Sequence, residues 1–168
     1  MQTPRHNRDM NMSIAGENNI AFRRAMLEEI LPLREAVIIA GTNRPSEYPG
    51  DRDETTFHVG GFAGGEIICC GTFLLTDWFG EPAYQLRGMA TREDARGEGI
   101  GDALLAATER FILDSTPVRQ LWCSARVSAV GFYQKVGWSV VSDVYDVPNV
   151  GPHRKMCRRI VGYNWDLS

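Results

Sequence analysis

The sequence predicts an α/β fold of the α+β type, in which helices flank a central mixed β-sheet. Strand-like and helix-like segments follow one another in the order β-α-β-β-β-α-β-α-β-β, which is typical of a mixed sheet with helices on its faces. A glycine-rich loop joins a strand to an amphipathic helix at 86–112. The 168 residues, 43% of them hydrophobic, suggest a single domain at 19–168, preceded by a polar, flexible tail at 1–18.

The domain is expected to begin with a strand, a helix and a long loop. A short strand fits 20–24, and apolar spacing favours a helix over 27–40. Pro32 implies that the regular part of this helix begins near it, and Gly41 is a natural stop. The polar stretch 42–56 is a loop of unusual length for a compact domain, and such loops are often functional.

Three strands are then expected in succession. Strands at 57–62 and 66–76 flank a tight turn at 63–65 and form a hairpin. A second connection, 77–82, leads to the strand at 83–91. Within that strand Gly88 indicates a bulge or a close approach of another group to the backbone.

The second half of the chain alternates helices and strands. Apolar residues recur at helical spacing from Ile100 to Ile112, and Pro117 ends this helix. The remaining expected elements are a strand at 118–123, a helix at 127–136, a strand at 138–147 and a closing strand at 153–161.

Composition excludes several classes of function. A net charge of −3 and a pI near 5.6 give no general electrostatic case for nucleic acid binding. The sequence has no apolar run long enough to span a membrane and no apolar core of a secretory signal near its N-terminus, so we expect a cytoplasmic protein.

The cysteine pattern predicts thiols rather than a metal site. The four cysteines are Cys69, Cys70, Cys123 and Cys157. None forms a C-x-x-C pair, so we expect no zinc and no other metal. Neighbouring Cys69 and Cys70 should point to opposite faces of a strand as reduced, partly buried thiols.

The glycine-rich loop Arg96-Gly-Glu-Gly-Ile-Gly101 has the composition of a phosphate site. Glycine tolerates positive φ, so several backbone N–H groups can turn toward one point. That point lies at a helix start, where backbone donors are unpaired and the dipole is positive, and Arg96 adds a cationic fork. The loop lacks the Gly-Lys-Ser/Thr of a Walker A loop and the G-x-G-x-x-G spacing of a dinucleotide fingerprint. The alternative is a glycine-rich turn with no ligand.

The pattern Arg96-Gly-x-Gly-x-Gly101 resembles the acetyl-CoA loop of the GNAT family of N-acetyltransferases, Gln/Arg-x-x-Gly-x-Gly/Ala, and matches each of its defined positions. The resemblance covers roughly 20–162 and implies the GNAT fold, with a central mixed sheet flanked by helices. It also implies that acetyl-CoA is the cosubstrate. The residues implied to bind it, through the loop and through backbone groups of the preceding strand, are Met89, Ala90, Thr91, Arg96, Gly97, Glu98, Gly99, Ile100 and Gly101.

A second motif, at 125–138, is similar to the family's Asn-x-x-Ala-x-x-Phe-Tyr-x-x-x-Gly-Phe segment. Arg126 stands where many members have Asn, and the resemblance assigns it to cofactor binding. Tyr133 matches the tyrosine that serves many members as general acid, protonating the departing CoA thiolate. The alternative is that Phe132 and Tyr133 only pack in the core.

The general base is left open among Glu81, Asp77, His58, His153 and a water held by backbone groups. A histidine at the start of a strand, such as His153, is more often structural. Cys123 and Cys157 have no histidine partner nearby in the sequence, which disfavours them as acyl-accepting nucleophiles.

The sequence therefore favours an N-acetyltransferase in which an amine attacks acetyl-CoA directly. The acceptor, a small-molecule or peptide amine, is not identified, and apolar strands near the C-terminus could pair in a homodimer. One alternative is a non-catalytic sensor that binds acyl-CoA or a nucleotide. Another is a nucleotide-phosphate enzyme on a doubly wound sheet, which would need ribose-binding or metal-binding carboxylates that the sequence does not arrange.

Overall fold

The computed structural model describes residues 12–13 and 19–162. Apart from 12–13, the predicted tail at 1–18 lies outside these residues. The chain divides into two compact units, one of Met1–Leu74 with Arg87–Thr108 and one of Leu75–Leu86 with Glu109–Ser168. The strands β4 (Glu66–Trp78) and β5 (Glu81–Thr91) and the helix α2 (Ile100–Ser115) each contribute residues to both units.

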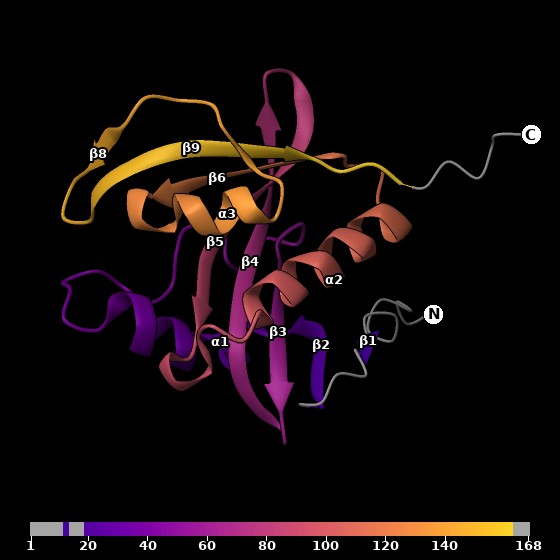
Figure 1. The fold of residues 1–168 in the computed structure, drawn as a ribbon, viewed down its shortest axis with the longest axis vertical. Helices are drawn as coiled ribbons and strands as arrows, with labels where there is room; N and C mark the ends of the chain where they lie inside the picture. The colour runs from indigo at the N-terminus through magenta and orange to yellow at the C-terminus, as the bar shows by residue number, and fades with distance from the viewer. Residues whose placement is uncertain (1–11, 14–18, 163–168) are drawn as a thin grey trace, which may run out of the picture. The chain divides into compact units, whose positions relative to one another are not determined.

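In the first unit, successive antiparallel strands follow the order of the sequence (Figure 1). They are β1 (Met12–Ser13), β2 (Ile20–Ala25), β3 (Phe57–Ala63) and β4. In the hairpin between β3 and β4, Ala63 pairs with Glu66 around Gly64 and Gly65, which have φ angles of 58° and 84°. The predicted strand at the start of the domain and the predicted hairpin are confirmed.

The helix α1 (Leu27–Arg34) begins earlier than Pro32 led us to expect. Glu29 Oε1 accepts the N–H of Met26 at 2.9 Å, which satisfies a backbone donor at the helix start. Pro32 therefore lies inside the helix, where it removes one backbone donor without ending the helix. The coil continues as a π-helix, Glu35–Ile39, and the chain leaves it at Gly41 with φ 80°.

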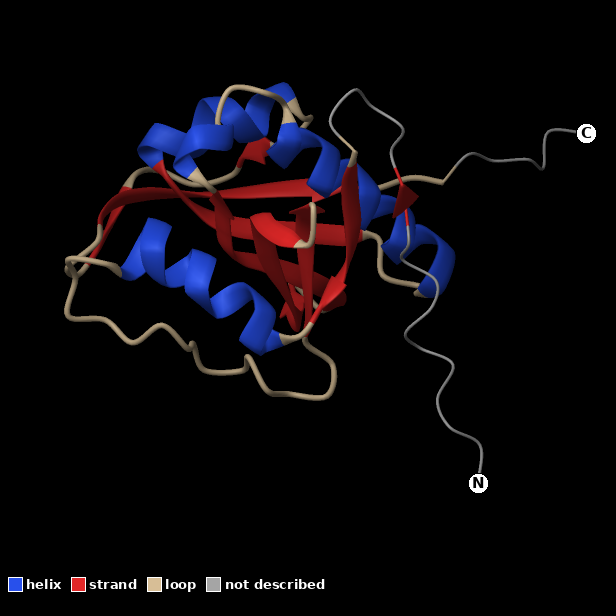
Figure 2. Ribbon diagram, turned by 90° about the horizontal axis from the view of Figure 1, so that it is seen from below, coloured by secondary structure: helices blue, strands red, loops and turns tan. Residues whose placement is uncertain are grey.

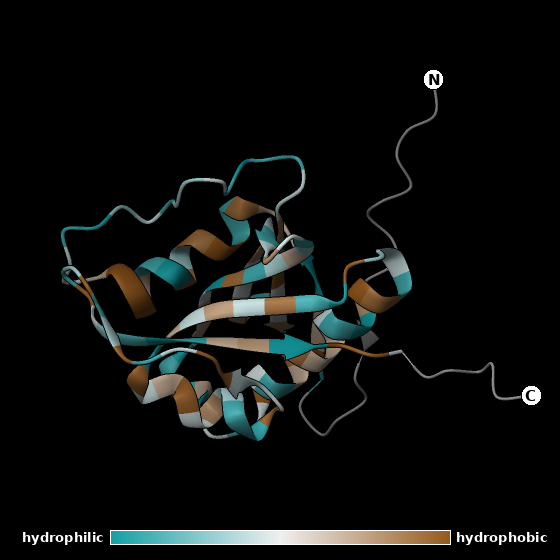
Figure 3. Cartoon of the chain, turned by 90° about the horizontal axis from the view of Figure 1, so that it is seen from above, coloured by the Kyte–Doolittle hydropathy of each residue, from teal (hydrophilic) through white to brown (hydrophobic). Residues whose placement is uncertain are grey.

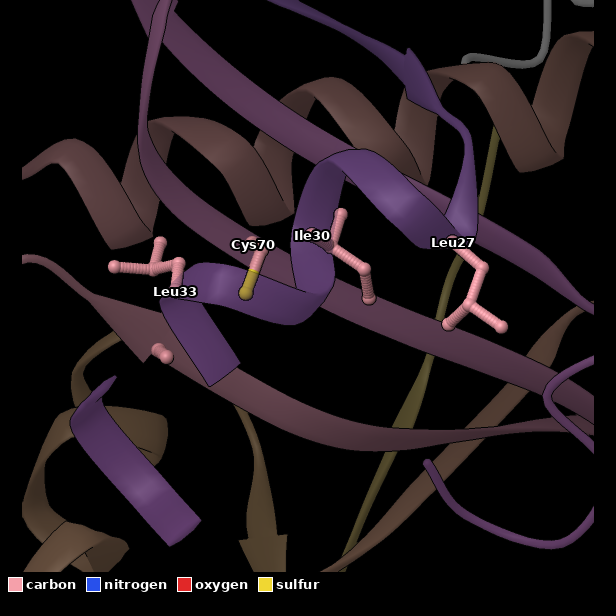
Figure 4. Close-up of a cluster of buried hydrophobic side chains, with 5 residues drawn as sticks. Leu27, Ile30, Leu33 and Cys70 are labelled. Carbon is pink, nitrogen blue, oxygen red and sulfur yellow. The ribbon is translucent and has the colours of Figure 1, made fainter. Parts of the chain in front are cut away.

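One hydrophobic cluster of the first unit lies between α1 and the sheet. Leu27, Ile30 and Leu33 of α1 pack with Cys70 of β4 and Ala90 of β5 (Figure 4). Their spacing places the apolar side chains of α1 on one face of the helix. Burying this face fixes α1 on the strand that precedes the glycine-rich loop.

The second unit is built on the antiparallel pair of β6 (Gln120–Arg126) and β9 (Gly151–Arg159), which lie side by side in Figure 1. β6 also pairs in parallel with β5, from Ala83–Gln120 to Leu86–Cys123. A 3₁₀ turn, Val127–Ala129, leads into the helix α3 (Val130–Lys135). Short strands β7 (Ser139–Val140) and β8 (Tyr145–Val147) pair with β9. The mixed sheet and its helices agree with the predicted fold class (Figure 2).

The single strand expected at 138–147 is a wrong prediction. The chain leaves β9 after Val140 and returns to it at Tyr145. Between these strands the Ser142 hydroxyl accepts the N–H of Lys155 at 2.8 Å, so a side chain replaces the carbonyl that a continuous strand would offer. No helix among the described residues combines the length and apolar character that crossing a membrane requires.

Candidate functional site

The glycine-rich loop lies in the first unit, between a short 3₁₀ turn at Glu93–Ala95 and α2. Gly97 and Gly99 adopt φ angles of 80° and 74°, the left-handed region that favours glycine. No described atom lies within 4 Å of the position that a Cβ would take at either residue. The glycines are therefore needed for the path of the backbone, and the space beside Gly97 and Gly99 is open.

The loop delivers the chain to the N-terminus of a helix of 16 residues. The N–H of Ala103 donates to the carbonyl of Gly99 at 3.1 Å, which closes the first helical turn. The N–H groups of Ile100, Gly101 and Asp102 precede that bond and belong to the set that a helix leaves without internal partners. They point in the direction in which the helix dipole is positive, which suits an anion.

Arg96 stands at the entrance to this loop in an extended conformation. Its side chain is exposed, and Nε donates to the carbonyl of Thr91, at the end of β5, at 3.3 Å. This bond ties the start of the loop to the strand that leads into it. The guanidinium nitrogens beyond Nε keep four of the five N–H donors of the fork for a ligand.

The strand residues implied to contact the cofactor lie in the same unit. Ala90 is buried in the cluster below α1, while Met89 and Thr91 are half-buried. The hydroxyl of Thr91 lies 3.7 Å from Cys69 Sγ. Gly88 has φ 63°, so the predicted irregularity in this strand is confirmed.

Tyr133 lies in the second unit, on α3. Its side chain is buried, and its ring contacts the rings of Phe132 and Trp138 at centroid distances of 5.0 and 5.2 Å. Its carbonyl accepts the N–H of Trp138 at 3.0 Å, which holds the turn at Gly137. These contacts fix the ring in place, as both core packing and a catalytic role require.

Arg126 ends β6 in the second unit, and its side chain is exposed. It pairs across the sheet with His153 of β9. The buried His153 ring bonds through Nδ1 to the carbonyl of Gly151 at 2.8 Å and lies against the ring of Tyr145.

The other base candidates have defined partners. Glu81 accepts a bond from Arg159 at 2.8 Å, and Asp77 accepts the N–H of Gly80 at 2.9 Å. His58 is buried with both ring nitrogens bonded, Nδ1 to Thr72 Oγ1 at 2.7 Å and Nε2 to the carbonyl of Asp51 at 3.0 Å. Burial lowers the pKa of His58, which favours its neutral form.

The cysteines behave as buried thiols. Cys69, Cys70 and Cys123 are buried and Cys157 is partly buried, and all four are free. Burial raises the pKa of each of the three buried thiols to about 12. Such groups remain protonated and are poor nucleophiles, which argues against an acyl-enzyme on Cys123.

An ion pair that sequence reasoning missed anchors the long loop. The side chains of Arg34 and Asp51 are both fully buried, with Arg34 Nη1 2.7 Å from Asp51 Oδ2. Arg34 also donates to Thr72 Oγ1 at 2.7 Å and to the carbonyl of Ser46 at 3.0 Å. Its one sequence signal is its position: Arg34 follows Leu27 and Ile30 at the spacing of the buried stripe of α1.

The bonds of the buried Arg34 fix the path of the loop 42–56. This loop is largely polar, as its teal and pale colours in Figure 3 show. Asp51 Oδ2 accepts the N–H of Tyr48 at 2.6 Å, and the Tyr48 ring lies 4.1 Å from the Arg34 guanidinium carbon. The loop is therefore held from inside, by a buried charge on α1.

Comparison with known proteins identifies the family. The family model described as an acetyltransferase (GNAT) domain matches residues 53–140. The uncharacterized N-acetyltransferase YitI of Bacillus subtilis is 35% identical over 120 residues, which cover 68% of this chain and 78% of YitI. The chain belongs to the GNAT family of acetyltransferases. It is a GNAT N-acetyltransferase, and the enzymes of this family transfer an acetyl group from acetyl-CoA to amines.

Solved structures share the fold of this GNAT enzyme. ElaA of Escherichia coli superposes with a TM-score of 0.72 at 23% identity, covering 83% of this chain and 99% of that one. An aminoglycoside 6'-N-acetyltransferase complexed with coenzyme A superposes with a TM-score of 0.63 at 13% identity, covering 80% and 91%. At these identities the likeness concerns the fold alone.

Proposed function

We propose that this GNAT enzyme holds the pyrophosphate of acetyl-CoA at the loop 96–101 and transfers the acetyl group to an amine by direct attack. The observation that supports this most strongly is the geometry of the loop. Gly97 and Gly99 take positive φ, their surroundings are open, and the next residues start a long helix. Backbone N–H groups in this arrangement bind phosphate oxygens without a side chain in the way.

Each implied residue of the loop has a distinct part in this proposal. The Arg96 guanidinium pairs with a phosphate oxygen. Gly97, Glu98 and Gly99 offer backbone N–H groups, and the exposed Glu98 carboxylate points to solvent, since an anion facing the phosphates would repel them. Ile100 and Gly101 are buried, so they set the first turn of α2 against the unit.

The remaining assignments concern the reacting groups. Backbone groups of Met89, Ala90 and Thr91 bond the pantetheine and acetyl amides, and one N–H polarises the thioester carbonyl. Arg126, exposed at the end of β6, pairs with the cofactor's polar groups. In the chemical step the amine nitrogen bonds to the carbonyl carbon, the C–S bond breaks, and Tyr133 donates a proton to the CoA thiolate.

The acceptor is a small-molecule or peptide amine. The aminoglycoside named for one structural neighbour belongs to that protein, and the fold it shares with this chain does not transfer the substrate. The experiment must therefore start from a panel: free amino acids, a diamine, an aminoglycoside and a short peptide with a free N-terminus.

The test measures free CoA thiol released from acetyl-CoA with each amine. We expect at least one amine to accelerate release by the wild-type enzyme and Tyr133→Phe to lower kcat by about 10²- to 10⁴-fold, the usual range for a general acid. Tyr84→Phe is the matched control, since it removes a hydroxyl from another buried tyrosine. Equal rates for both variants would assign Tyr133 to core packing. Binding of acetyl-CoA without transfer to any amine would favour the sensor alternative.

A further inference from the structure

The chain's histidines differ in what their ring nitrogens can do. The sequence has three, of which His6 lies outside the described residues. His58 uses both nitrogens in bonds inside the first unit. His153 uses only Nδ1 among the described residues, in its bond to the Gly151 carbonyl. No hydrogen bond joins its Nε2 to another described residue, and Nε2 is not among the fully buried polar atoms that lack a partner.

The bond to Gly151 settles the tautomer of His153. A carbonyl oxygen can only accept, so Nδ1 carries the hydrogen and donates it over 2.8 Å. In the neutral ring Nε2 then carries the lone pair. A histidine whose inner nitrogen donates to a backbone carbonyl keeps an unprotonated outer nitrogen, which is able to accept a proton.

The register of the second unit places this ring in a row of polar side chains. Arg126 of β6, His153 of β9 and Tyr145 of β8 are direct neighbours across three strands, so their side chains share one face of the sheet. The Tyr145 ring lies 6.2 Å from that of His153, and its hydroxyl is hydrogen-bonded to Ser124. The charged or titratable groups that face His153 are thus Arg126 and Tyr145 on neighbouring strands and Lys155 on its own.

The opposite face of β9 faces the helices of this unit. Arg158 lies on that face, since its position differs from that of His153 by an odd number. Its guanidinium bonds Glu109 of α2 at 2.6 Å and the carbonyl of Gly137, just after α3, at 3.3 Å. The helical layer of this unit carries Tyr133, and His153 faces the other way. In direct attack the acid and the base serve different atoms, since the acid protonates the departing sulfur and the base takes a proton from the incoming nitrogen.

We propose that His153 is the general base of the acetyl transfer, taking a proton from the attacking amine at Nε2. This inference rests on the proposed function. As the nitrogen bonds to the acetyl carbon, its proton passes to Nε2, the C–S bond breaks, and the thiolate receives a proton from Tyr133. His153 then releases its proton to solvent and Tyr133 regains one, so the amine loses one proton and CoA gains one.

Two substitutions of His153 distinguish the role of a general base from that of a structural histidine. The amide of His153→Asn can still donate to the Gly151 carbonyl from the place of Nδ1, but it has no basic nitrogen. His153→Ala removes both functions. Tyr145→Phe is the neighbouring control, which alters the same row without touching the ring nitrogens. Thermal unfolding of each variant shows whether it folds.

The assay is thiol release from acetyl-CoA with the fastest amine of the panel. The proposal expects both His153 variants to lose about 10²- to 10⁴-fold in kcat, with an unchanged KM for acetyl-CoA. It also expects one limb of the wild-type pH–rate profile to disappear in His153→Asn and to remain in Tyr145→Phe. Wild-type activity in His153→Asn would overturn the proposal and leave His153 a structural residue.

A second measurement needs no acceptor. Nitrogen-15 NMR of the histidine rings in the full-length wild-type protein should show the neutral His153 ring protonated at Nδ1 and not at Nε2. A ring protonated at Nε2 instead would overturn the proposal. A failure of the proposed function can be told apart from a failure of the His153 proposal, because it appears in the wild-type protein. In that case acetyl-CoA does not stabilise the wild type, and no amine accelerates thiol release.

Discussion

Gly88 lies directly against the guanidinium of Arg34. A Cβ on Gly88 would lie 2.9 Å from Arg34 Nε, and the glycine adopts φ 63°. The strand therefore passes the buried arginine at a point where only hydrogen fits. This contact links the strand that leads to the glycine-rich loop with the helix that anchors the long loop 42–56.

Substituting Gly88→Ala should destabilise the protein by about 2–4 kcal/mol, since a positive φ costs about 1–2 kcal/mol and the clash adds to it. Gly64→Ala is the control, because Gly64 has a similar φ of 58° with no atom within 4 Å of its Cβ position. Urea unfolding measures both. Equal losses would show that Arg34 moves aside without cost.

Asp51→Asn should cost about 3–5 kcal/mol, because it leaves the fully buried Arg34 charge without its partner. Glu47→Gln, which breaks an exposed pair with Arg52, should cost less than about 1 kcal/mol. The measured quantity is the free energy of unfolding in urea. A loss for Asp51→Asn as small as that of the control would show that the pair does not anchor the loop.

The buried His58 predicts an acid-sensitive fold. Burial lowers its pKa in the folded state, so the unfolded chain binds the proton more readily. The stability that depends on neutral His58 is present above a pH of about 6.5 and is lost as the pH falls through the folded pKa. His58→Gln should flatten the fall in unfolding free energy as the pH drops below about 6.5. A slope equal to the wild type's would contradict this role.

The thiols should differ in their rates of alkylation. With a pKa of about 12, Cys69, Cys70 and Cys123 hold almost no thiolate near neutral pH. Iodoacetamide should therefore label Cys157 first in the native protein, as read by peptide mass spectrometry. Early labelling of Cys69 or Cys70 would mean that the strand β4 opens under native conditions.

The sequence predicted the elements whose signals are local. The glycines of 96–101 and the helical spacing from Ile100 mark a loop and a helix wherever the chain folds, and both were placed correctly. The split between β7 and β8 depends on Ser142 bonding a residue of another strand, which no local pattern reveals. The start of α1 depends on Glu29, which bonds the backbone of Met26. The helix therefore begins before Pro32, although the proline predicted a later start.

The residues of the candidate site were likewise predictable only where their sequence signal is local. The motif identified the loop and Tyr133 as candidates, and neither assignment has yet been tested. The partners of Arg34 come from segments far apart in the sequence, so the buried pair appeared only with the fold. The tautomer of His153 depends on one backbone carbonyl, whereas its place at the start of a strand only favoured a structural role.

The most direct test of the cofactor site is thermal unfolding of wild type, Gly97→Ala and Gly41→Ala with acetyl-CoA, CoA or ATP. Gly41 matches the φ of Gly97, 80°, but lies outside the loop. Acetyl-CoA and CoA should stabilise wild type and Gly41→Ala, by about 2.7 kcal/mol at a hundredfold excess over Kd, and ATP should not. Gly97→Ala should lose most of this shift. No stabilisation of the wild type by either CoA species, or an equal shift in Gly97→Ala, would contradict a cofactor site at this loop.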